Sequence, residues 1–104
     1  MSNYSPGRWV ILEFKTPEST FRKVFAGWYG GYTGSDSWKL SSGITSIVDN
    51  GEYYEILNES GSVYYCYKQA EGFSSYMGMV LSSWEDEMDK LEGYSVTPIK
   101  SDLI

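Results

Sequence analysis

The chain has 104 residues, enough for one domain but not for a second independent core. It has no histidine and one cysteine, Cys66, which excludes Ser-His triads, histidine-based metal sites and an intrachain disulfide. Aromatic residues make up 17%, which favours a β-rich domain, and the net charge of −6 counts against non-specific binding to phosphate backbones.

The first elements are a polar arm and a hairpin. Residues 1–7 form a short arm closed by Pro-Gly, without the charged leader and apolar run of a signal peptide. Residues 8–15 alternate as a strand, and the Thr-Pro-Glu-Ser sequence that follows is typical of a turn. Residues 20–28 alternate again, so we expect an antiparallel hairpin.

The middle of the chain predicts a bent strand and two tight hairpins. Residues 37–48 are too long for a flat strand, and Gly43 marks a bend that would let the segment serve two sheets. Asn50-Gly51 favours a primed turn with both central residues at positive φ. Residues 53–57 and 62–68 then form the fourth and fifth strands around a second short turn.

After residue 68 the periodicity becomes helical. The apolar stripe at steps of three and four consists of Phe73, Met77, Val80, Leu81, Trp84, Met88 and Leu91. It predicts a helix over residues 74–92, with Ser74 as N-cap, Gly93 past its end and an acidic outer face at residues 85–92. Residues 94–99 are expected to form an edge strand, and residues 100–104 a fraying tail.

The expected fold is therefore mainly β, in a single domain. Residues 8–68 would form a small five-stranded, strongly bent antiparallel barrel, followed by one amphipathic helix. Cys66 is expected to be a small buried strand residue, because no cationic neighbour in the sequence would activate its thiol.

Three segments carry a family resemblance: RWVILEF, KVFAGWYGGYTGSDSWKLSSGI and SGSVYYCYK. Together they resemble a family of small proteins of unknown function from cyanophages and marine metagenomes, over roughly residues 8–80. The resemblance implies an Sm-like, SH3-type barrel and, by analogy with Sm proteins, a ring-like homo-oligomer. The chain departs from Sm proteins in lacking their Arg-Gly step and in placing its helix after the barrel, so no RNA-contacting residue is transferred.

The candidate binding or interface surface combines aromatic and basic residues of the first half of the chain. Its members are Trp28, Tyr29, Tyr32, Trp38, Arg22, Lys23 and Lys39. The rings could stack on bases or sugars, or could pack against the domain or a second copy. Packing or self-association is favoured because exposed aromatic patches are rare on monomers.

The leading functional hypothesis is a non-enzymatic phage-type protein that self-associates, since no acid/base pair can be defended. The first alternative is an Sm-like module that binds RNA or single-stranded DNA. The second is an acidic inhibitor of a host protein. We expect no cofactor, no metal and no membrane association, and a location in the cytoplasm, of the host cell if the protein is phage-encoded.

Overall fold

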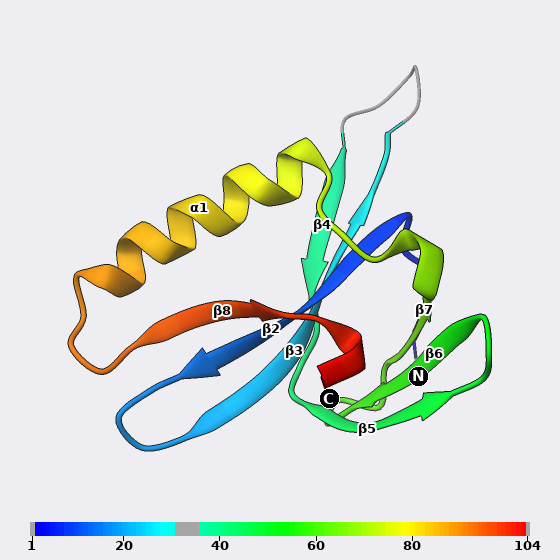
Figure 1. Ribbon diagram of the computed structural model, residues 1–104, viewed down its shortest axis with the longest axis horizontal. Helices are drawn as coiled ribbons and strands as arrows, with labels where there is room; N and C mark the ends of the chain where they lie inside the picture. The colour runs from blue at the N-terminus through cyan, green and yellow to red at the C-terminus, as the bar shows by residue number, and fades with distance from the viewer. Residues whose placement is uncertain (1, 31–35, 104) are drawn as a thin grey trace.

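The computed structural model describes residues 2–30 and 36–103, which form two four-stranded sheets and one long helix (Figure 1). The strands are β1 (Asn3–Tyr4), β2 (Arg8–Lys15), β3 (Thr20–Trp28), β4 (Ser37–Leu40), β5 (Ile44–Asp49), β6 (Tyr53–Asn58), β7 (Val63–Tyr67) and β8 (Ser95–Ile99). The helix α1 spans Ser75–Asp89, and 3₁₀ turns η1 and η2 span Lys68–Ala70 and Ser101–Leu103. The first sheet has the order β1-β7-β6-β5, and the second β4-β3-β2-β8.

The second sheet is the middle layer of three. On β2, Trp9 and Ile11 belong to a core that the two sheets share, whereas Leu12 and Phe14 belong to a core beneath α1. All four side chains are buried, which explains why this strand reads as a nearly continuous apolar run. The expected hairpin of residues 8–15 and 20–28 is confirmed, with β2 and β3 antiparallel along their whole length.

The expected five-stranded barrel is corrected by the strand count and by the topology. The described residues contain eight strands in two sheets, and these sheets do not close into a barrel. One pair, β1 with β7, is parallel, so the arrangement is not wholly antiparallel. A register shift between Ile44 and Ser46 bends β5, and such bulges increase the local twist. Within the described residues, no ladder joins β5 to β3.

The segment expected as one bent strand, residues 37–48, is instead interrupted between Leu40 and Ile44. Its two halves do serve different sheets, as predicted. At the corner, the Ser41 N–H donates to the Val24 carbonyl of β3, and the Gly43 carbonyl accepts from the Glu59 N–H beside the first sheet. A Cβ on Gly43 would meet the carboxylate end of the Glu59 side chain, which would have to move aside.

The Asn-Gly turn differs from the prediction by one residue. Only Gly51 has a positive φ, at 93°, whereas Asn50 does not. The Asp49 carboxylate accepts from the Gly51 N–H at 2.9 Å. This bond places Gly51 at the first central position of the turn, so the turn lies one residue later along the chain than the sequence suggests.

The helix begins where expected but ends three residues early. Ser74 caps it, its Oγ accepting from the Met77 N–H at 3.2 Å. After Asp89, backbone N–H groups donate to the carbonyl three residues earlier instead of four, as in a 3₁₀ turn. Gly93 then adopts a φ of 84°. Phe73 and Leu91, expected on the apolar stripe, are 41% and 52% exposed because they lie beyond the two ends of the helix.

Both ends of the described chain contain secondary structure that the sequence does not predict. Within the arm, β1 pairs with β7, and the Tyr4 ring stacks on Tyr64 at 4.8 Å. Within the tail, η2 is held by Glu71, which accepts from the backbone N–H and the hydroxyl of Ser101. Neither pairing has a local sequence signal, because each joins segments far apart in the chain. The edge strand expected over residues 94–99 is present as β8.

Candidate functional site

The predicted aromatic surface is divided between two faces of the second sheet. Trp28 lies on the side of the first sheet, with its ring 6.2 Å from that of Tyr4 and its Nε1 donating to the Ser5 carbonyl. Trp38 lies on the side of α1, where its ring is 5.1 Å from that of Trp84. The two tryptophans therefore do not share one surface.

The two tyrosines of the same prediction add little to a common surface. Tyr29 is 57% exposed, and its hydroxyl accepts a 3.3 Å hydrogen bond from Nε of Arg8. Tyr32 lies outside the described residues.

The three cations are also separated. Arg22 pairs with Glu13 at 3.1 Å. Lys23 lies over the ring of Phe21, on the α1 side, and Lys39 lies over the ring of Tyr4, at the other end of the sheet. Each is therefore occupied by a different partner, and the structure does not assemble them into a basic patch.

A large hollow lies where a barrel would have closed, between β5 and the β2–β3 hairpin. It has a volume of about 910 Å³. Its walls are the end of β2, the start of β3, most of β5 and the turn η2. We call this hollow the seam groove. Of the predicted surface residues that the structure describes, only Arg22 lines it.

One wall of the seam groove is the unpaired edge of β5. At the closed end of the β5–β6 hairpin, the Asn50 N–H donates to the Tyr53 carbonyl at 2.9 Å. Bonded and non-bonded pairs alternate along an antiparallel ladder, so the N–H and C=O groups of Asp49 and Ile47 point away from β6. Since β5 is the last strand of its sheet, these groups have no strand partner within the described residues.

The facing wall is the unpaired half of β3. The Val24 carbonyl accepts from the Ser41 N–H, and the Val24 N–H donates to the Ser41 hydroxyl at 2.8 Å. By the same alternation, the N–H and C=O groups of Arg22 and Thr20 lie on this edge. The neighbouring strand β4 pairs with β3 only from Phe25 onward, so these groups also lack a strand partner in the described chain.

The seam groove is acidic. Its lining contains the carboxylates of Glu13, Asp49, Glu59 and Asp102 against the single guanidinium of Arg22. Low-dielectric walls of one charge sign concentrate the field in a cleft and attract ligands of the opposite sign.

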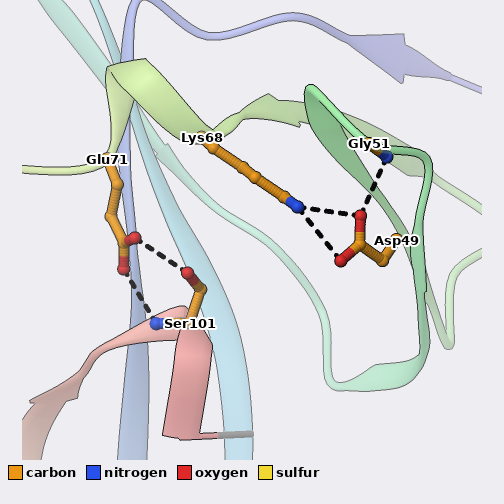
Figure 2. A network of polar contacts seen from close by, with 5 residues as sticks. All are labelled: Asp49, Gly51, Lys68, Glu71 and Ser101. Carbon is orange, nitrogen blue, oxygen red and sulfur yellow. Dashed lines mark hydrogen bonds and ion pairs between the residues drawn. The ribbon is translucent and has the colours of Figure 1, made fainter.

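Asp49 stays ionised at the mouth of the groove. Figure 2 shows its carboxylate accepting from the Lys68 ammonium at 2.9 and 3.0 Å and from the Gly51 N–H. The Lys68 hydrogen bond, followed by that of Gly51, lowers the pKa of Asp49 below its ordinary value. The same pair raises the pKa of Lys68.

The turn η2 is fixed beside the groove by the second contact of Figure 2. Both oxygens of Glu71 are engaged, one by the Ser101 N–H at 2.9 Å and one by its hydroxyl at 2.8 Å. This link holds Asp102, one of the lining acids, next to β5.

No protein family, curated protein or solved structure matched this chain in the comparisons. The candidate site therefore stands on its own geometry.

Metal ligands and the single cysteine are further candidates for chemistry. Residues 2–30 and 36–103 contain no cluster of acidic and sulfur ligands suited to a metal ion. Cys66 is buried as expected, and burial raises the pKa of its thiol, which leaves it a poor nucleophile. Within the same residues, no helix is both long and apolar enough to cross a membrane.

Sequence reasoning missed the seam groove because its walls are defined by an absence of pairing. No residue type marks a strand edge that lacks a neighbour. The one local signal is Gly43, which predicts the corner at which the chain passes from β4 in the second sheet to β5 in the first.

Proposed function

We propose that this protein is a non-enzymatic binding module that accepts an extended segment of another polypeptide in the seam groove. The observation that carries the proposal is that two unpaired strand edges, one on β5 and one on β3, line the same hollow. An extended peptide can add a strand to such an edge, with main-chain hydrogen bonds giving affinity and side-chain pockets giving specificity.

The other edges of the two sheets are poorer acceptors. The strands β1 and β4 have two and four residues, and β8 contains Pro98, which has no N–H to donate. The edge of β5 has six residues, a length of about 20 Å at roughly 3.3 Å per residue. It therefore suits a segment of about six residues.

The charge of the groove selects the chemistry of that segment. Glu13 and Asp49 are paired with Arg22 and Lys68, and the other two lining carboxylates, those of Glu59 and Asp102, favour a peptide with lysine or arginine at alternate positions. A second copy of this chain, which has a net charge of −6, is a poorer occupant.

Fluorescence anisotropy with labelled peptides tests the proposal. An eight-residue peptide that alternates lysine with threonine or valine is expected to bind, whereas its glutamate counterpart is not. N-methylation of alternate backbone amides keeps every side chain but removes donors, and should weaken binding about tenfold or more, since each lost bond contributes about 1 kcal/mol. If the affinity stays unchanged when one set of alternate amides is methylated and also when the other set is methylated, strand addition is contradicted.

Matched variants locate the binding site on the protein. The double change Glu59→Gln and Asp102→Asn removes two charges from the groove lining. Glu85→Gln with Asp86→Asn removes the same charge from exposed positions on α1. The first pair should weaken binding of the lysine peptide, and the second should leave it nearly unchanged.

Self-association, including the ring that the Sm-like resemblance implies, is the second candidate. It is favoured by large apolar side chains that are exposed on or beside α1: Met79 at 71%, Tyr76 at 38% and Trp38 at 37%. Light scattering at high micromolar concentration checks it, and a monomer under these conditions would remove this candidate.

Nucleic-acid binding receives less support, because Arg22, Lys23 and Lys39 are dispersed and the net charge is −6. Titration with single-stranded oligonucleotides at low salt should give no binding, and measurable binding there would restore this alternative.

A further inference from the structure

A second hollow, distinct from the seam groove, is lined by hydroxyl groups. It has a volume of about 460 Å³ and lies between β1, β4, β7 and the turn that joins β6 to β7. Its lining consists of five serines, two tyrosines, Leu40 and Lys39, and includes no carboxylate. In a chain with a net charge of −6, a hollow with one cation and no acid is unusual. We call it the hydroxyl hollow.

The serine hydroxyls form a chain with one hydrogen to spare. Ser42 accepts from the Ser60 N–H and donates its own hydroxyl hydrogen to Ser60, both at 3.0 Å. The Ser60 and Ser62 oxygens are 3.1 Å apart, and either can be the donor. Two hydrogens are available for this one bond, so one of the two hydroxyls keeps a hydrogen for a ligand.

Tyr64 supplies a second unused group. Its side chain is fully buried and helps to line the hollow, yet its hydroxyl has no hydrogen-bond partner among residues 2–30 and 36–103. A buried hydroxyl without a partner costs about 1–3 kcal/mol relative to a bonded one, so such groups usually have a reason to exist. Burial raises the pKa of Tyr64 to about 12, which keeps the hydroxyl protonated and able to donate at neutral pH.

Lys39 supplies the charge. Its ammonium lies 5.3 Å from the centre of the Tyr4 ring, and it forms no ion pair with an acid in the described chain. The Tyr4 ring in turn stacks on Tyr64 with centroids 4.8 Å apart, and all three residues line the hollow. Donors without acids around them are suited to an anion.

We propose that the hydroxyl hollow binds a small tetrahedral oxyanion, either free phosphate or the phosphate group of a monoester. Lys39 provides the charge, and Tyr64 and the Ser60–Ser62 pair provide neutral donors. The site is independent of the seam groove, because the two hollows have no lining residue in common.

Thermal unfolding of the full chain tests this inference. Inorganic phosphate and O-phosphoserine are added separately at millimolar concentration, with sodium chloride at matched ionic strength as the reference. A ligand that binds only the folded state raises the unfolding midpoint, and an increase of about 6–11 °C is expected near ten times the dissociation constant. A larger shift with phosphate indicates the free ion, and a larger shift with phosphoserine indicates an esterified group. No shift with either would overturn the proposal.

Three variants connect any shift to this hollow. Lys39→Met keeps the stem but removes the charge, and should abolish most of the shift. Lys23→Met is the matched control, because Lys23 also lies over an aromatic ring but does not line the hollow. Tyr64→Phe keeps the stacked ring and should weaken phosphate binding several-fold. Equal shifts in the wild type and in Lys39→Met would contradict the assignment.

Discussion

Single side chains replace backbone partners at the points where strands and helices end in this protein. Ser41 serves the edge of β3 where β4 stops, Asp49 serves the Gly51 N–H in the turn after β5, and Ser74 caps α1. In each case an oxygen satisfies an N–H group that the regular ladder leaves unpaired. These contacts fix where the edges of the seam groove begin and end.

Ser41→Ala should destabilise the fold. Ser41 is 4% exposed, and its hydroxyl is the acceptor for the Val24 N–H, so the substitution leaves a buried donor unpaired. The expected loss is about 1–3 kcal/mol in the free energy of unfolding, measured by urea denaturation. Ser46→Ala, at an exposed position on β5, is the control and should change the stability little.

Asp49 should make the stability depend on pH at the acid end. Its folded-state pKa is lowered, so its contribution is present above the unfolded-state pKa and is lost as pH falls through the folded-state value. The wild type should therefore lose more stability than Asp49→Asn below about pH 4. If the difference in stability between the wild type and Asp49→Asn, measured by melting curves, stays constant as the pH falls, this role of Asp49 is contradicted.

At the scale of elements, local patterns were sufficient for some and insufficient for others. Alternation of apolar and polar residues predicts the β2–β3 hairpin, and apolar residues at steps of three and four predict α1. Both elements are present. By contrast, β1 and η2 are stabilised by contacts with Tyr64 and Glu71, far along the chain, and no local pattern could reveal them.

Two glycines near α1 should respond in opposite directions to alanine. Gly78 lies inside the helix with nothing within 4 Å of the added Cβ, so Gly78→Ala should stabilise by about 0.5–1 kcal/mol. Gly93 has a φ of 84°, and its added Cβ would lie 2.9 Å from Pro17, so Gly93→Ala should destabilise by about 1–2 kcal/mol. Thermal melts of both variants check the signs, and a stabilising change at Gly93 would contradict the geometry.

At the scale of the whole molecule, the two sheets share a core but leave one seam unpaired. Strand alternation in the sequence predicts a mainly β fold, but barrel closure depends on how far β5 twists away from β3, which no residue type encodes. The same reason limits prediction of the site. Arg22 belongs to the predicted surface because of its charge, whereas the role we propose for it in the groove rests on its backbone edge and its position opposite β5.

Peptide binding in the seam groove should weaken as salt increases. The attraction between the lining carboxylates and a lysine-containing peptide is screened, with a Debye length of about 10 Å at 0.1 M salt and about 3 Å at 1 M. Anisotropy titrations across this range should show that the affinity falls as salt increases. The share of the binding free energy that comes from backbone hydrogen bonds should persist at high salt. Affinity that is independent of salt would exclude the acidic lining as a determinant.

Amide hydrogen exchange, read residue by residue by NMR with and without the lysine peptide, tests strand addition most directly. Exchange slows when an amide gains a hydrogen-bond partner. We predict that binding slows exchange at Ile47 and Asp49 on β5, or at Thr20 and Arg22 on β3, while Val48, already bonded to β6, changes little. Protection confined to α1, or none at any of these four amides while the peptide is bound, would contradict the proposal.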